Sequence, residues 1–195
     1  MKIGLLSMFI IILMGTCRPQ EPDPKAAIFF KKASETLKQN PTNPDSLMSA
    51  LNILDSAIHL DSNNVRYLFT KSKISITLKK YDLAINSCNE ILAKHKDDYL
   101  TTLTKGVVFE LSNRIDSAKQ TYRRALNLLN KTKFEKTMYK EHERIILFGL
   151  LRDTSKFNTS LNLFKDQFKS ENDFIHYYQE LKGFNRMDYI NSYSY

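Results

Sequence analysis

The chain has 195 residues, of which 42% are hydrophobic and 26% are charged, and its formal net charge is +8 at pH 7. This length and composition are typical of a folded body with one substantial core. Strand-like alternation is nowhere sustained, which excludes a sheet-based fold and predicts an all-α protein.

The N-terminus begins with MKIGLLSMFIIILMGTC, in which a run of thirteen residues from Ile3 to Gly15 contains only one polar side chain, Ser7. Such a short run is typical of a signal peptide, because a bilayer span needs about 20 residues. The motif LMGTC resembles the lipobox of bacterial lipoproteins, whose cysteine becomes the lipid-bearing N-terminus. We therefore predict a signal peptide at 1–16, lipid attachment at Cys17 and localisation in the bacterial cell envelope, anchored to a membrane. An ordinary secretory signal cut nearby and an uncleaved anchor are the alternatives.

The small number of cysteines and the distribution of charge are consistent with an exported protein. The chain has two cysteines, so lipidation of Cys17 leaves Cys88 alone, and its apolar position predicts a small buried side chain. Removing residues 1–16 removes one lysine from the 29 basic residues, and the remaining 28 against 21 acidic residues give +7. Basic residues are scattered at helical intervals, so we expect a basic face near a membrane and no nucleic-acid partner.

After the signal peptide, residues 17–24 are proline-rich and predict a stiff tether. A helical period begins at Lys25 and is broken by NPTNPD at residues 40–45, where Asp45 or Ser46 would cap the next helix. Further helices are predicted over 47–60, 65–79, 81–95, 98–112, 115–130, 134–152, 155–169 and 172–183.

One helical pattern recurs at an interval of 34 residues. KYDLAINSCNEILAKH at 80–95 is followed by RIDSAKQTYRRALNLL at 114–129, and three alanines, Ala50, Ala84 and Ala118, keep the same register. Small residues at such positions allow paired helices to approach closely. Two helices per 34 residues indicate stacked helix pairs.

The spacing and residue classes resemble the tetratricopeptide repeat (TPR) family, which also has small residues where this sequence has Ser72 and Gly106. The prolines that usually close each repeat are absent here. The resemblance implies an α-solenoid of about three to four helix pairs over residues 25–183, with the helix at 172–183 capping its apolar end. The last pair is displaced by eight residues, which we place near NKTKFEKT at 130–137.

No constellation of residues predicts a reaction. EHERI at 141–145 lacks a second histidine at zinc-ligand spacing, and the other histidines are dispersed without cysteine partners. Asp82 and Asp116 are most simply residues of helix starts, where an acid interacts favourably with the helix dipole. We expect no enzyme activity, no metal and no cofactor.

The resemblance places a binding groove on the first helix of each pair. The groove residues that it implies are Arg66, Phe69, Lys73, Ile76, Leu103, Val107 and Glu110. They predict an exposed apolar strip with a basic edge, in which Arg66 and Lys73 favour an acidic partner. Some relatives clamp a partner's C-terminal carboxylate, but Thr70, Leu100 and Thr104 do not support such a clamp here. The alternative for the groove residues is packing against neighbouring helices.

Residues 184–195 form an aromatic-rich tail, and half of the ten tyrosines lie from Tyr177 onward. The tail could fold back along the solenoid, occupy its groove, dock a partner or fray. The predicted function is that of a membrane-tethered scaffold or adaptor that binds a protein or peptide through its concave face. The alternative is a protein that binds an envelope glycan or a peptidoglycan fragment.

Overall fold

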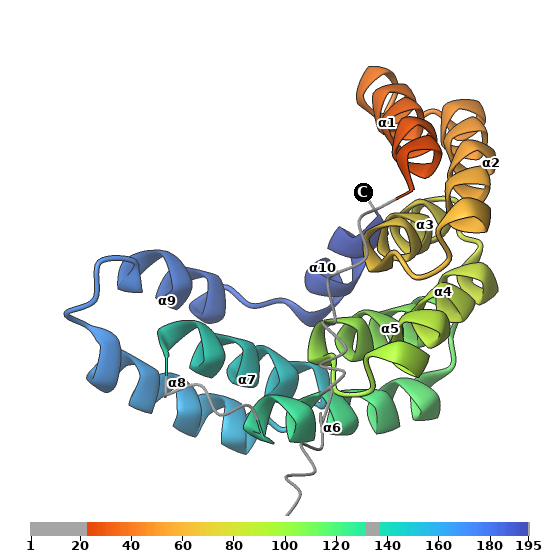
Figure 1. Cartoon of the computed structure of the whole chain (residues 1–195). Helices are drawn as coiled ribbons and strands as arrows, with labels where there is room; N and C mark the ends of the chain where they lie inside the picture. Colours follow the sequence, from red (N-terminus) through yellow and green to blue (C-terminus); the bar gives the residue numbers. More distant parts are fainter. Residues whose placement is uncertain (1–22, 132–136, 195) are drawn as a thin grey trace, which may run out of the picture.

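The computed structural model describes residues 23–131 and 137–194. Within these ranges every regular element is a helix, which confirms the all-α prediction (Figure 1). The predicted signal peptide, the lipid attachment at Cys17 and the centre of the segment NKTKFEKT lie outside the described residues.

The helices follow one another with short connections. They are α1 (Pro24–Gln39), α2 (Pro44–Leu60), α3 (Val65–Thr77), α4 (Tyr81–Lys94), α5 (Tyr99–Leu111), α6 (Ile115–Lys131), α7 (Met138–Leu150), α8 (Thr154–Phe168), α9 (Phe174–Lys182), α10 (Arg186–Asn191) and a 3-10 turn, η1 (Ser192–Ser194). Helices α1 to α8 pack as successive pairs, each helix against the next, and the predicted helices over 65–130 begin and end within two residues of the observed ones.

The alanines that repeat along the sequence lie inside these pairs. Ala50, Ala84 and Ala118 are all buried, on α2, α4 and α6 respectively. A methyl side chain keeps the paired helices close, and a larger one would separate them. The sequence prediction for these three positions is therefore confirmed.

The turn inside three of the pairs has one geometry. Lys79, Asn113 and Arg152 each have a φ near +60°, in the left-handed region. The residue after each donates a backbone hydrogen bond to the carbonyl five residues earlier, as from Lys80 to Ser75 at 2.8 Å. This is the Schellman helix ending, which glycine usually provides. The sequence did not reveal it, because none of the three is a glycine.

The start of α2 differs from the prediction. The helix begins at Pro44, and Asn43 caps it by accepting hydrogen bonds from the backbone nitrogens of Asp45 and Ser46, both at 3.0 Å. The expected cap at Asp45 or Ser46 is wrong, because proline lacks an N–H and fits the first helical turn without losing a hydrogen bond.

The pairs stack into a curved solenoid (Figure 1). Helices α1, α3, α5 and α7 line its inner face, while α2, α4, α6 and α8 lie outside. Helix α9 packs on α7 and α8, and the chain then returns along the inner face, where α10 contacts α5 and η1 contacts α3.

Candidate protein-binding surface

Six of the seven groove residues predicted from the sequence fall into two groups on the inner face, and the seventh, Glu110, is half-buried. Arg66, Phe69 and Lys73 on α3 are exposed, with 36% of Phe69 accessible to solvent. Ile76, Leu103 and Val107 are buried. The expected exposed apolar strip is therefore wrong at these three residues, which are packed as the alternative had it. Whether the groove residues bind a partner stays a prediction.

The C-terminal end of the chain covers part of this buried group. We call residues 184–194 the C-terminal segment. Ile190 of this segment is buried in the same hydrophobic cluster as Leu103 and Val107, and Tyr189 and Tyr193 pack against that cluster. Tyr193 also packs against the cluster that contains Ile76. Of the alternatives for the tail, the structure shows the segment folded back on the inner face.

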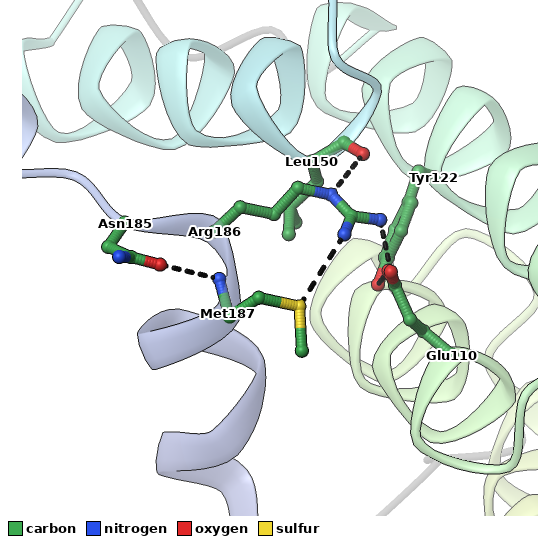
Figure 2. Close-up of polar contacts among 6 residues, drawn as sticks. All are labelled: Glu110, Tyr122, Leu150, Asn185, Arg186 and Met187. Carbon is green, nitrogen blue, oxygen red and sulfur yellow. Dashed lines mark hydrogen bonds and ion pairs between the residues drawn. The ribbon is translucent and has the colours of Figure 1, made fainter.

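A polar contact near the start of the segment joins it to the solenoid (Figure 2). The Arg186 guanidinium forms an ion pair with Glu110 of α5 and donates a hydrogen bond to the Leu150 carbonyl at 3.1 Å. The other Glu110 carboxylate oxygen accepts a hydrogen bond from the Tyr122 hydroxyl at 2.9 Å. Both charged side chains are largely shielded, since Glu110 is 6% exposed and Arg186 14%. A shielded carboxylate requires a cation beside it, because an unpaired buried charge is strongly destabilising.

Tyr122 reaches Glu110 because α5 carries Gly106 where the two helices meet. A Cβ atom at Gly106 would lie 2.6 Å from the Cδ1 and Cε1 atoms of the Tyr122 ring. The missing side chain leaves room for the ring to cross α5, and burial together with Glu110 raises the pKa of the Tyr122 hydroxyl, which therefore stays protonated as a donor. Gly106 thus determines where the carboxylate is held.

A second glycine accommodates the segment. A Cβ atom at Gly149 of α7 would lie 2.4 Å from a ring carbon of Phe184, so the ring lies directly on the helix backbone. Phe184 also contacts the Phe157 ring of α8, with centroids 5.6 Å apart. Asn185 then caps α10, accepting hydrogen bonds from the backbone nitrogens of Met187 at 2.9 Å and Asp188 at 3.2 Å.

The two tyrosines of the segment are held in a largely apolar setting. The hydroxyl oxygens of Tyr189 and Tyr193 are 3.3 Å apart, and the centroids of their rings are 5.7 Å apart. Burial raises the pKa of both hydroxyls above the ordinary value. Both side chains are therefore neutral near pH 7 and contribute mainly apolar area and local hydrogen bonds.

The basic groove residues of α3 contact aromatic rings. The Arg66 guanidinium lies 4.8 Å from the centroid of the Phe30 ring, and the Lys73 ammonium lies 5.7 Å from that of Phe69. Both cations remain exposed, where such contacts contribute about 0.5–1 kcal/mol. Glu110 differs from them in being shielded from solvent and acidic.

Sequence reasoning placed Glu110 in the groove but missed Arg186 and Tyr122 as its partners. A signal for Arg186 exists: the inward residues of the segment are Arg186, Tyr189, Ile190 and Tyr193, at i, i+3, i+4 and i+7. This spacing is that of an amphipathic helix that docks one face.

No other cluster in the described part of the chain offers accessible chemistry. Buried His142 lies between two carboxylates, with its Nδ1 atom 3.5 Å from Glu143 and its Nε2 atom 3.3 Å from Glu180. Among the described residues no group of three or more His, Cys, Asp or Glu side chains could hold a metal ion. Cys88 is buried beside Ser72, and burial raises the pKa of its thiol, which makes it a packing residue.

Three observations define the architecture: successive helices pack in pairs, the turns inside three pairs have the same geometry, and the buried alanines keep one register. The chain is a TPR-like solenoid. Across residues 23–131 and 137–194, no helix of this solenoid is both long and apolar enough to cross a membrane.

No family model and no curated protein matches the sequence. Solved structures with similar helical arrangements include the first TPR of Spaghetti (RPAP3) bound to the HSP90 peptide SRMEEVD, at 20% identity and a TM-score of 0.49, covering 68% of this chain and 91% of that one. MamA from Desulfovibrio magneticus RS-1 is similar over 77% of this chain and 99% of that one, at 12% identity and a TM-score of 0.47. MamA AMB-1 covers 80% of this chain and 82% of its own, at 12% identity and a TM-score of 0.49.

Proposed function

We propose that this TPR-like chain is a non-enzymatic scaffold, anchored to a bacterial envelope membrane by lipid at Cys17, that binds a segment of another protein on its inner face. In this proposal α1 to α8 supply four helix pairs, and α9 closes the apolar end of the last pair. Nucleic acid and cofactors have no part in it.

One observation supports the binding function most directly. The inner face at α3 and α5 already accommodates a short helical segment, the chain's own residues 184–194, through an ion pair, aromatic contacts and a buried isoleucine. A surface that holds one such helix has the shape and chemistry to hold another. No corresponding observation favours glycan binding.

Site-specific photocrosslinking in native membranes tests the location of binding. A photoreactive residue at exposed Phe69 on α3 should yield a discrete adduct with a partner protein. The matched control is Asn127, an exposed residue of α6. Helix α6 belongs to the outer layer of the solenoid (Figure 1). Equal adducts from both positions, or none from Phe69, would contradict an inner-face binding site.

Metabolic labelling with a fatty-acid probe tests the anchor. The wild-type chain should be labelled and should fractionate with membranes, whereas Cys17→Ala should lose both properties. Equal labelling of the two chains would contradict lipidation at this residue and leave the inner-face proposal to the crosslinking result.

A further inference from the structure

The C-terminal segment is placed as a bound ligand would be. It does not extend the stack of helix pairs but crosses back over the inner face, and Arg186 pairs with a residue 76 positions earlier in the chain (Figure 1). Gly183 and the first two residues of the segment, Phe184 and Asn185, connect α9 to α10 without helical structure. Its helix α10 has six residues. A helix this short is unstable in isolation, so its structure depends on the surface beneath it.

The segment presents one chemical face to the solenoid. Arg186, Tyr189, Ile190 and Tyr193 are at least partly buried, whereas Met187, Asp188, Asn191 and Ser192 are exposed. The inward side chains therefore combine one cation with aromatic and aliphatic groups at helical spacing.

The receiving surface selects for this chemistry. With the segment in place Glu110 is 6% exposed and accepts a hydrogen bond from the Tyr122 hydroxyl, so an occupant that covered this site without a cation would leave a shielded carboxylate unpaired. A guanidinium also satisfies the Leu150 carbonyl, as Arg186 does at 3.1 Å. Leu103 and Val107 are buried on the same surface. To keep them covered, the occupant must carry apolar side chains one helical turn after its cation.

Resting on the proposed function, we propose that the C-terminal segment is an internal ligand of the inner face, and that the partner displaces it with a short helix of the same chemistry. That helix carries an arginine or lysine followed at positions +3, +4 and +7 by aromatic or aliphatic residues. The sequence had suggested an acidic partner selected by Arg66 and Lys73. The shielded group at the centre of the surface is Glu110, and it selects the opposite charge.

Peptide uptake by the full chain tests this inference without the envelope partner. The probe is a fluorescent peptide of residues 183–195, and its binding is measured by anisotropy. Wild-type chain should bind it poorly because its own segment fills the surface. Arg186→Glu places like charges together at Glu110, so the internal segment should detach and peptide affinity should rise roughly tenfold to a hundredfold.

Three controls establish the role of the ion pair. Lys182→Glu makes the same charge change at an exposed neighbouring residue and should leave peptide affinity at the wild-type level. The double variant Glu110→Arg with Arg186→Glu restores opposite charges within the chain and should again exclude the peptide. A probe peptide that itself carries Arg186→Glu should not bind the opened single variant.

Failure of a folded Arg186→Glu chain to take up the peptide would overturn the inference and make the segment a structural cap. If that variant unfolds, amide hydrogen exchange of the wild-type chain decides. An internal ligand exchanges residues 184–194 well before the core of α5, whereas a cap exchanges together with α7 to α9. Concentration-dependent dimers in light scattering would instead identify a second copy as the occupant and overturn an internal ligand.

The two proposals can fail separately. Peptide uptake without any crosslinked envelope protein would count against the proposed function alone. A Phe69 adduct from a chain whose Arg186→Glu variant takes up no peptide would count against the internal ligand alone.

Discussion

Helices α3 and α5 occupy equivalent places in consecutive repeats, yet their inner faces differ. Phe69 on α3 is 36% exposed, whereas Leu103, 34 residues later on α5, is 1% exposed. Lys73 is exposed and its counterpart Val107 is buried. The backbone repeats, but one surface remains open beside the segment that covers the other.

The difference originates where each helix meets its pair partner. In α3 and α4 the contact is between two small side chains, Ser72 Oγ and Cys88 Sγ, 3.5 Å apart. At the same repeat positions α5 and α6 have Gly106 and Tyr122. The tyrosine crosses the glycine and its hydroxyl holds Glu110, which in turn binds Arg186 (Figure 2). A glycine and a tyrosine in place of Ser72 and Cys88 inside the pair therefore accompany a different inner surface on α5.

The largest expected effect is a difference in the free energy of unfolding between substitutions on α5 and on α3. Leu103→Ala should lower the free energy of unfolding by about 2–5 kcal/mol, because it leaves a cavity in a packed cluster. Phe69→Ala, at the equivalent position, should cost less than about 1 kcal/mol, because its side chain is partly solvated. Urea unfolding followed by circular dichroism measures both. Equal losses would show that the two faces are equally covered in solution.

A second substitution addresses the contact inside the pair. Gly106→Ala should destabilise by about 1–3 kcal/mol despite the better helix propensity of alanine, since the new methyl group would clash with the Tyr122 ring. The matched change Ser72→Ala removes only a weak contact with Cys88 and should cost less. Thermal unfolding compares them, and a stabilised Gly106→Ala chain would refute the close approach.

A smaller effect is expected from the hydroxyl alone. Tyr122→Phe should cost about 0.5–1.5 kcal/mol, because it leaves one Glu110 oxygen without its hydrogen bond. Hydrogen exchange of residues 184–194 should accelerate as the carboxylate loses its fixed orientation. Tyr67→Phe on α3 serves as the control and should leave exchange of the segment unchanged. Identical exchange in both variants would mean that Glu110 holds Arg186 without help from Tyr122.

The smallest expected effect is a dependence on pH, which sets in only above about pH 10. Burial raises the pKa of Tyr189 and Tyr193, so their neutral forms favour the docked segment. This contribution is fully present below the unfolded value near pH 10 and is lost as pH rises through the folded pKa. Phenolate absorbance of the wild-type chain and of a Tyr189→Phe, Tyr193→Phe chain should differ by two late-titrating groups. Titration of both tyrosines near pH 10 would place them in solvent.

Much of the fold could be predicted because it is written in local and periodic patterns. The buried alanines at a 34-residue interval and the apolar helical period predicted the pairs, since close helix packing tolerates only small side chains at these points. The left-handed conformation of Lys79, Asn113 and Arg152 in these turns was not predicted, because it is imposed by the packing of the helices that the turns join.

The candidate surface was predicted in part. The repeat register placed Glu110 and Leu103 on the inner face, and the aromatic composition singled out residues 184–195 as a segment with a role. Neither pattern could specify that Arg186 lies beside Glu110, because 76 positions separate them along the chain. No local propensity encodes such a contact.

The sequence by itself determined a helical repeat, the spacing of its pairs and the positions where helices meet, because these depend on side-chain size and period within about 34 residues. Only the tertiary structure decided which inner surface is open and which is filled. That outcome depends on the curvature of the whole solenoid and on the return of the chain across it, and it pairs a shielded carboxylate with a cation from the far end of the sequence.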